Sequence, residues 1–305
     1  MPNATDGAAG DDASDVALTV VVPAHDAAAT IGAQLDALLA QTWDRPWEIV
    51  VVDNGSRDAT RAVVEQYARR DARVRLVDAP ERGSAAYARN TGIAAARAEA
   101  VAMCDADDVV HEGWVAAMGD ALREHELVTG RIDVHLLNPE WVVASRGLAV
   151  ERGPMTFGDL FEFANSGNMG VRKHVVERFG AFDPAYAAGE DIELSFRLWQ
   201  AGIRVHYVEG ALLHYRYRDT LPALWRQARA YGRVQPALVR TVEQAGYGVA
   251  PDREWRRWLW LARHAGLLTD RAGRARWIGV AGGRVGRLEG ALDVAFRRRR
   301  DARRG

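Results

Sequence analysis

Short apolar runs alternate with amphipathic stretches along the first hundred residues of the chain. Four runs rich in valine and other apolar residues are expected to be strands: 18–22, 48–52, 74–77 and 100–104. Three stretches separate them and carry helix-forming patterns: 30–40, 60–70 and 84–97. This β-α-β-α-β-α-β alternation predicts an α/β fold with a Rossmann-like open, mostly parallel sheet and flanking helices.

Two residues mark the boundary between the first strand and the first helix. Pro23 is expected to end the strand, because proline has no N–H to donate to the ladder. Thr30 is expected to be the N-cap of the helix. Residues 24–26 should then form a turn.

The rest of the chain is less regular. Further strands are expected at 127–135, 165–171 and, along an edge, 204–208. A helix should begin at Gly189-Glu190-Asp191 and end at Gly202, whereas 136–165 have no clear assignment. The chain then reads as helical and basic. We divide it into an acidic, disordered segment (1–15), an α/β domain (16–220) and a helical, basic C-terminal extension (221–305).

Composition narrows the class of protein. The chain has 48% hydrophobic and 27% charged residues and a net charge of -1, with fifteen arginines against six acids in residues 252–305. The remainder is therefore acidic, which argues against a nucleic-acid-binding body. Cys104 is the only cysteine, which excludes an internal disulfide and a cysteine zinc cluster. Residues 1–15 lack the pattern of a signal peptide and no 18-residue apolar window occurs, so we expect a cytoplasmic protein.

Three predicted strands end in polar residues: Pro23-Ala24-His25-Asp26, Asp53-Asn54-Gly55-Ser56 and Asp105-Ala106-Asp107-Asp108. Ligands of open α/β sheets bind at the carboxyl ends of the strands. An apolar strand that ends in clustered carboxylates suits a divalent metal carrying a phosphate-rich ligand. The alternative for the third motif is an acidic surface turn.

Ordered motifs over about residues 18–218 resemble family 2 glycosyltransferases of the GT-A fold. The motifs are strand-Pro23-x-x-Asp26, Asp53-Asn54-Gly55-Ser56, Arg82-Gly83 with Ala88-Arg89-Asn90-x-Gly92, Asp105-x-Asp107, Gly180-x-Phe182-Asp183, Glu190-Asp191 followed by Glu193 and Arg197, and His214. Each motif is weak alone, whereas the ordered set is specific. The resemblance implies an inverting transfer from a UDP-, GDP- or dTDP-linked sugar to the hydroxyl of a glycan, lipid-linked or small-molecule acceptor, in cell-envelope polysaccharide synthesis.

The resemblance also implies which residues bind the donor. Asp53 would bind the base or ribose; the alternative is that it opens an Asx turn, and the two roles can coexist. Pro23, His25 and Asp26 would line the same pocket, and His25-Asp26 departs from the family's usual residues, which leaves the base open.

Further roles follow for the charged groups around the diphosphate. Arg82 and Arg89 would bind its oxygens, or Arg89 would link its helix to the acidic motif. Arg218, together with Arg216, would close over the diphosphate from a mobile loop; an exposed basic loop is the alternative.

For the cofactor, the resemblance implies Mn²⁺ or Mg²⁺. Asp107 would be the direct ligand and His214 the third ligand, with Asp105 on the ribose or a metal-bound water. Asp108 is expected to be structural.

For the chemistry, Asp191 would be the general base and Glu190 would position it or the acceptor. The alternative is that both acids only cap their helix.

The C-terminal extension carries two further expectations. Trp225, Gln227, Arg229 and Tyr231 would sit on a helix beside the acceptor. The basic tail, with Trp255, Trp258 and Trp260, would either pack on the catalytic domain or contact the inner face of a membrane peripherally.

Two other functions remain open. A sugar-phosphate nucleotidyltransferase shares a related core but favours a glycine-rich basic loop after the first strand, where this chain has Pro23-Ala24-His25-Asp26-Ala27. A non-catalytic nucleotide-sugar-binding module would have no need of the intact acids. A nicotinamide dehydrogenase is excluded, since no G-x-G-x-x-G follows the first strand.

Overall fold

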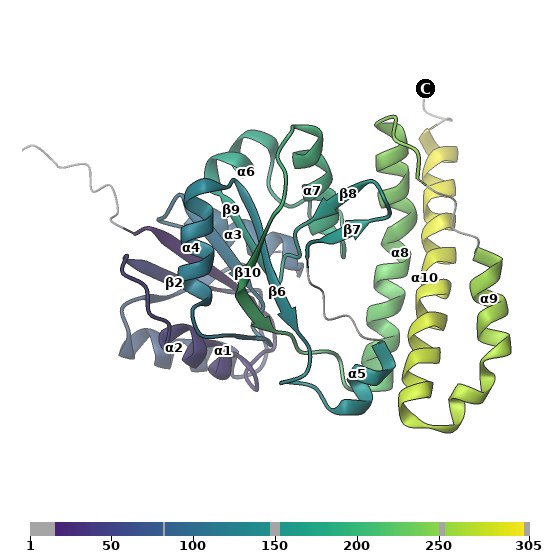
Figure 1. Ribbon diagram of the computed structural model, residues 1–305, viewed down its shortest axis with the longest axis horizontal. Helices are drawn as coiled ribbons and strands as arrows, with labels where there is room; N and C mark the ends of the chain where they lie inside the picture. The colour runs from purple at the N-terminus through teal and green to yellow at the C-terminus, as the bar shows by residue number, and fades with distance from the viewer. Residues whose placement is uncertain (1–15, 82, 147–152, 250–253, 302–305) are drawn as a thin grey trace, which may run out of the picture.

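An eight-stranded, mostly parallel sheet organises the computed structural model, which describes residues 16–81, 83–146, 153–249 and 254–301 (Figure 1). Its strand order is β3-β2-β1-β4-β9-β6-β10-β5. The strands are β1 (Leu18–Ala24), β2 (Trp47–Asp53), β3 (Val74–Asp78), β4 (Ala100–Cys104), β5 (Val109–Val110), β6 (Leu127–Asp133), β9 (Asn168–Arg172) and β10 (His206–His214). Only β9 and β5 run antiparallel to their neighbours. The predicted segment 1–15 lies outside the described residues.

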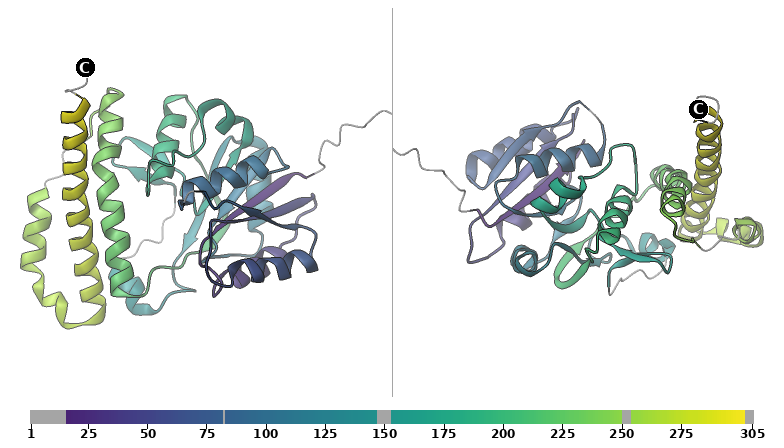
Figure 2. Two further views of the ribbon diagram at one scale, coloured as in Figure 1. Left: turned by 180° about the vertical axis from the view of Figure 1, so that it is seen from behind. Right: turned by 90° about the horizontal axis from the view of Figure 1, so that it is seen from above.

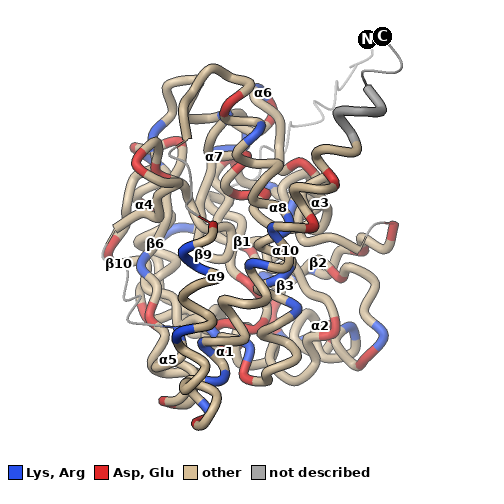
Figure 3. The backbone as a smooth tube through the Cα atoms, turned by 90° about the vertical axis from the view of Figure 1, so that its right-hand side faces the viewer, with Lys and Arg blue, Asp and Glu red and all other residues tan. Residues whose placement is uncertain are grey.

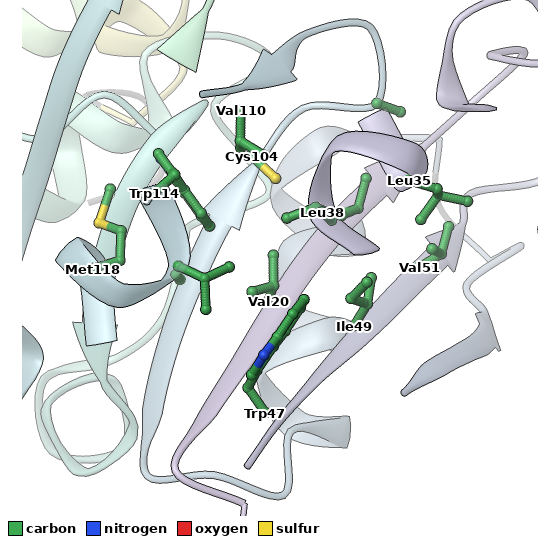
Figure 4. Packing of buried hydrophobic residues seen from close by; sticks show 14 of the residues in the cluster. Val20, Leu35, Leu38, Trp47, Ile49, Val51, Cys104, Val110, Trp114 and Met118 are labelled. Atoms are coloured by element: carbon green, nitrogen blue, oxygen red, sulfur yellow. The ribbon is translucent and has the colours of Figure 1, made fainter. Parts of the chain in front are cut away.

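Helices cover both faces of this sheet and make three layers. One face carries α1 (Ile31–Leu39), α2 (Thr60–Arg70) and α4 (Trp114–Glu124), and the other carries α3 (Ala85–Ala95), α6 (Lys173–Phe179) and α7 (Glu190–Gln200). On the first face, Val20 and Ile49 of the sheet pack with Leu35 and Leu38 of α1 (Figure 4). The alternating valines of β1 and β2 supply both cores, so these strands are apolar on both sides.

The predicted α/β alternation is confirmed, with local corrections. The prediction that Pro23 ends the first strand is wrong, because β1 continues to Ala24 beside β2. The ladder with β4 ends at Val21, so the missing N–H of Pro23 falls beyond it. Thr30 occupies the N-cap position, but its hydroxyl donates to Ala27 instead of accepting from the helix.

The region without a sequence assignment contains short elements. These are α5 (Glu140–Arg146) and a separate hairpin of β7 (Met155–Phe157) and β8 (Phe161–Phe163). The strand expected at 204–208 is β10, which begins at His206 and continues to His214. It does not form the edge, because the two-residue β5 pairs along its other side.

The C-terminal extension is helical, as expected, and stands beside the sheet layers (Figures 1 and 2). It comprises α8 (Leu221–Gln244), α9 (Glu254–Arg263), a 3-10 turn (Ala265–Thr269) and α10 (Arg271–Asp301). None of the helices in the described ranges has both the length and the apolar character that a bilayer crossing needs.

Glycines allow α10 to lie against α8 at backbone distance. A Cβ at Gly286 would lie 2.0 Å from the carbonyl oxygen of Arg229, and one at Gly290 would lie 2.0 Å from that of Arg233. The same arginines pair across the helices with Glu289 and Asp293. Because these ion pairs are partly exposed, the close backbone contact contributes more to the packing than they do.

This contact generates a stability prediction. Gly286→Ala should lower the thermal unfolding temperature, because overpacking costs about 1–3 kcal/mol and exceeds the roughly 1 kcal/mol gained in helix propensity. Gly279→Ala is the matched control, since its Cβ would meet only Leu224 at 3.8 Å. It should raise the unfolding temperature measured by circular dichroism. Equal shifts in the two variants would contradict the close-packing account.

Candidate active site

The carboxyl ends of β1, β2 and β4 form one rim, as the sequence predicted. Ala24 lies beside Asp53 in the parallel register, and Met103 lies beside Val21. Two cavities of about 440 and 510 Å³ open at this rim. Both are lined by Arg89, Asp105, Asp107 and Arg218, so they adjoin at the acidic motif.

The 440 Å³ cavity lies over the end of β1. Pro23, His25 and Asp26 all line it. Asp26 has φ 48°, and its carboxylate accepts from the backbone N–H of Arg57 at 2.7 Å. This bond fixes a left-handed turn that a non-glycine residue rarely adopts. The His25 side chain stays 57% exposed, so it is free to contact a ligand.

Asp53 is less accessible than the sequence implied. It is buried, and its Oδ1 accepts from the backbone N–H of Ser56 at 3.0 Å, which is the Asx turn. Its neighbour Asn54 lines the cavity instead. Contact between Asp53 and a nucleotide stays a prediction. Arg82 lies outside the described residues, and Ser84, two residues later, caps α3 by accepting from the N–H of Tyr87.

The acidic motif forms a compact group of oxygens. Asp105, Asp107 and Asp108 each offer an oxygen, all within 4.8 Å of one another. Asp108 is buried: its Oδ1 accepts from the N–H of Arg216 at 2.7 Å, and its Oδ2 has no partner among the described residues. Burial and then Asp105 raise the pKa of both Asp107 and Asp108. An orphaned oxygen and destabilised carboxylates are what a divalent cation would relieve, so this donor set fits Mn²⁺ or Mg²⁺.

Gln34 of α1 holds the backbone around this motif. Its Nε2 donates to the carbonyl of Asp105 at 3.2 Å, and its Oε1 accepts from the N–H of Val110 at 3.0 Å. It is completely buried. Sequence patterns could not identify it, because a glutamine within an amphipathic helix reads as an ordinary polar position.

Arg89 joins the acidic motif to α7. It is only 4% exposed, and its terminal nitrogens donate to Asp105 Oδ1 and Glu190 Oε1, each at 2.7 Å. Burial alone would lower the pKa of Arg89, but the carboxylates, first Asp105 and then Glu190, raise it. This geometry matches the structural link that the sequence left as an alternative. Binding of the diphosphate by Arg89 stays a prediction.

Glu190 and Asp191 begin α7, after Gly189 in the left-handed region at φ 70°. Neither acid is the N-cap, and both line the 510 Å³ cavity. The carboxylate of Asp191 accepts from the N–H of Ser166 at 3.2 Å and from that of Ile192 at 2.9 Å. Burial raises the pKa of Asp191, and the bond from Ser166 offsets part of the rise. Burial also raises the pKa of Glu190, against the effect of Arg89.

His214 does not belong to the group of aspartates. At the end of β10, its Nδ1 hydrogen-bonds to Asp133 at 2.9 Å and its Nε2 to His111 at 3.2 Å. Both ring nitrogens therefore have partners within the protein. Metal ligation by His214, which the resemblance implied, stays a prediction. A single sequence gave no sign of Asp133 or His111 as partners.

The loop after His214 folds onto the acidic motif. Arg216 donates from Nε to the carbonyl of Asp107 at 2.8 Å. Arg218 donates to Asp107 Oδ2 at 2.7 Å while its side chain remains 51% exposed. Burial would lower the pKa of Arg218, but Asp107 raises it. Arg218 therefore lines both cavities, and its closure over a diphosphate stays a prediction.

The far wall of the 510 Å³ cavity comes from α5 and α8. Gln227 and Tyr231, one helical turn apart, both line it. Trp225 and Arg229 do not line it. Trp225 packs against Gly282, and Arg229 pairs with Glu289. The sequence did not single out Arg146, which also lines the cavity.

Arg146 is held by polar and aromatic groups. Its guanidinium lies 4.8 Å from the ring centroid of Tyr217 and donates to Gln227 at 3.1 Å. Burial lowers the pKa of Arg146.

Comparison with known proteins gives consistent matches. The family model described as Glycosyl transferase family 2 matches residues 19–179, and the one described as Glycosyl transferase family group 2 matches residues 100–279. Glycosyltransferase AglE of Haloferax volcanii is 27% identical over 204 residues, which are 64% of this chain and 65% of AglE. The pre-mycofactocin glycosyltransferase of Mycobacterium tuberculosis is 26% identical over 261 residues, 82% of this chain and 53% of that protein. The chain thus spans less than two thirds of the length of these relatives.

A solved structure shares the fold. The mannosyltransferase PcManGT from Pyrobaculum calidifontis, in complex with GDP-Man and Mn²⁺, superposes with a TM-score of 0.58 at 20% identity. The superposition covers 94% of this chain and 90% of that one.

The ion pairs of the buried Arg89 with Asp105 and Glu190 predict that Arg89 contributes far more to stability than Arg218 does. Arg89→Met should lower the free energy of unfolding by about 3–5 kcal/mol, because the buried Glu190 and the partly buried Asp105 would lose their shared counter-charge. Arg218→Met is the matched control, and its exposed pair with Asp107 should cost about 1 kcal/mol or less. Urea titration at neutral pH measures both. Similar losses in the two variants would mean that Arg89 is no more than a surface ion pair.

Proposed function

The chain belongs to glycosyl transferase family 2, and on that premise we propose that it moves a sugar from a nucleoside-diphosphate sugar to an acceptor hydroxyl. Its α/β fold is the GT-A fold of its structural neighbours. One observation carries the proposal. Arg89 bonds Asp105 and Glu190 at 2.7 Å each, and the acidic motif and the acids of α7 line the same 510 Å³ cavity.

The donor occupies the 440 Å³ cavity in this proposal. Its nucleoside lies over Pro23, His25 and Asp26, and its diphosphate lies toward the acidic motif, which both cavities share. Arg218 changes partner from Asp107 to the diphosphate when the donor binds. Its half-exposed side chain makes that exchange possible.

Asp105, Asp107 and Asp108 hold Mn²⁺ or Mg²⁺ in this proposal, without His214, because the histidine ring is engaged with Asp133 and His111. When bound, the cation neutralises charge that grows on the departing diphosphate. The protein's own part is to keep three carboxylates close together before the cation arrives. Gln34 and the backbone N–H of Arg216 do this.

Asp191 is the general base for the acceptor hydroxyl, and the transfer inverts the anomeric carbon. Burial raises the pKa of Asp191, which makes it a stronger proton acceptor than an exposed aspartate. The N–H groups of Ser166 and Ile192 fix its orientation. Glu190 is tied to Arg89 and therefore acts by positioning.

The assignment of Asp191 as the general base predicts that removing its carboxylate leaves nucleotide binding intact but lowers the rate of sugar transfer. Asp191→Asn should bind UDP, GDP or dTDP, whichever the wild type prefers, with unchanged affinity, and should lose transfer by roughly a hundredfold or more. Because the pKa is raised, wild-type transfer should fall on acidification at a pH above the usual range for aspartate. Calorimetry and product analysis over a panel of nucleotide sugars, with and without EDTA, measure these effects.

The exposed Asp159→Asn is the matched control and should behave as wild type. Full transfer by Asp191→Asn would show that another group is the base. Transfer that survives EDTA would remove the cation from the proposal.

A peripheral contact with a membrane is a second part of the proposal. Leu288, Leu292 and Phe296 lie one turn apart on α10 and are 53%, 60% and 65% exposed. Glu254, the first residue of α9, pairs with Arg284 and Arg287, so the stripe lies beyond the part of α10 that α9 covers. Figure 3 shows the side of the molecule on which α9 and α10 lie. The sequence then continues with four arginines, 297–300, which suits an anionic lipid surface at the inner face of a membrane.

Vesicle binding tests this contact. The triple variant L288S/L292S/F296S should lose co-sedimentation with vesicles that contain phosphatidylglycerol, because the apolar area that would enter the bilayer is gone. Leu268→Ser, which removes another exposed leucine from the 3-10 turn, should sediment as wild type. If wild type and triple variant pellet equally, the stripe does not bind membranes.

A further inference from the structure

We propose that the acceptor carries an apolar group and that a second, apolar cavity beside α7 holds it while the acceptor hydroxyl lies at Asp191. This inference rests on the proposed function and names the chemical class of the acceptor. The shared chemistry is an apolar chain or aglycone linked to a sugar or other hydroxyl. A lipid-linked sugar and a small apolar glycoside are its two sources.

The cavity has a volume of about 540 Å³, within the range of small-molecule sites. It lies between the β7–β8 hairpin, α8 and α10. Its walls are mostly apolar, with Phe157 and Phe163 from the hairpin and Val234, Leu238 and Val239 from α8. An apolar guest gains free energy here by leaving water, in proportion to the area it buries.

This apolar cavity adjoins the candidate active site. It shares Phe163, Gly189, Ile192 and Tyr231 with the 510 Å³ cavity. The shared segment from Gly189 to Ile192 is the start of α7, which carries Glu190 and Asp191. A molecule that places its hydroxyl at Asp191 can therefore extend an attached group past Ile192 and Tyr231 into the apolar space.

The glycines of α10 indicate that this space is kept open. A Cβ at Gly286 or Gly290 would collide with the backbone of α8, whereas one at Gly279 or Gly283 would not. The backbone of Gly283 does touch α8, since a Cβ at Gly232 would lie 2.1 Å from the carbonyl oxygen of Gly283. A Cβ at Gly279 would meet only Leu224 at 3.8 Å, and one at Gly283 only the carbonyl of Ala228 at 3.8 Å. Glycine within a helix costs about 1 kcal/mol relative to alanine. Both residues line the cavity, so the absent side chains leave volume for a ligand.

The charged residues at this wall have partners within the protein. Arg284 and Arg287 both pair with Glu254, at 2.9 and 2.5 Å, and Arg287 also donates to Gln235 at 2.9 Å. Because both guanidinium groups have partners within the protein and most of the other lining side chains are apolar, the cavity suits an apolar group. The hairpin wall is also firm, because Phe161 stacks on Phe157 with ring centroids 5.4 Å apart.

Filling the cavity tests the inference. Gly283→Leu places a side chain into the space, and Gly279→Leu is a second filling variant in case the first unfolds. Ala291→Leu adds the same side chain to an exposed position of α10 and is the matched control. The probe is octyl β-D-glucoside below the concentration at which it forms micelles, compared with methyl β-D-glucoside, by calorimetry. Wild type and control should bind the octyl form at least about tenfold more tightly than the methyl form, and the filling variants should lose that preference.

Transfer assays extend the test to the two sources. The same series of sugars is offered as methyl glycosides, octyl glycosides and farnesyl-phosphate-linked forms. A KM for either apolar form at least about tenfold below that of the methyl form, lost in Gly283→Leu but not in Ala291→Leu, supports the inference. The form with the lower KM identifies the source.

Two failures are distinguishable. Equal binding of octyl and methyl forms, or equal effects of Gly283→Leu and Ala291→Leu, would overturn the apolar site. Preferential octyl binding without transfer from any nucleotide sugar would keep the cavity as an apolar site but contradict the proposed function, and with it the assignment of the ligand as an acceptor.

Discussion

The bridge from Asp105 through Arg89 to Glu190 is the interaction on which the site depends. It joins the end of β4 to the start of α7, two elements more than eighty residues apart in the chain. Several carboxylates meet in this region, and their mutual repulsion and burial would oppose folding without a cation among them. Arg89, nearly inaccessible to water, supplies that charge from α3. In the proposed function, its position also divides the space into a donor side at the β1 rim and an acceptor side at α7.

The same arrangement leaves the acids unequally compensated. Glu190 and Asp105 share Arg89, Asp107 pairs with the exposed Arg218, and Asp108 keeps one oxygen without a partner among the described residues. Within the described part of the chain, the carboxylate of Asp191 accepts hydrogen bonds from backbone N–H groups alone. A cation would relieve the group around Asp107 and Asp108, whereas a proton from an acceptor would satisfy Asp191. The proposed roles, metal binding by the acidic motif and proton abstraction by Asp191, therefore follow from the positive partner that each carboxylate does not have within the protein.

The sequence predicted local features well and side-chain partnerships poorly. Runs of valine revealed the sheet, because strands that are buried on both faces consist almost entirely of apolar residues. Since the strands are parallel, their carboxyl ends then placed Pro23, Asp53 and Asp105 along one rim. The hydrogen bonds of His214 to Asp133 and His111 join three separate elements, so no local pattern encodes them. Similarly, the extension to Ala24 beyond Pro23 depends on where the neighbouring ladder stops. The apolar cavity arises from α8, α10 and a hairpin within a stretch that gave no assignment.

The proposed function depends on direct displacement, in which Asp191 deprotonates the acceptor hydroxyl. Proton NMR of the first-formed product, recorded during transfer from the preferred nucleotide sugar, is the decisive measurement. The anomeric configuration should be opposite to that of the donor, because a single displacement inverts the carbon that is attacked. A product that retains the donor configuration would contradict the account, since it would require two displacements or front-face attack.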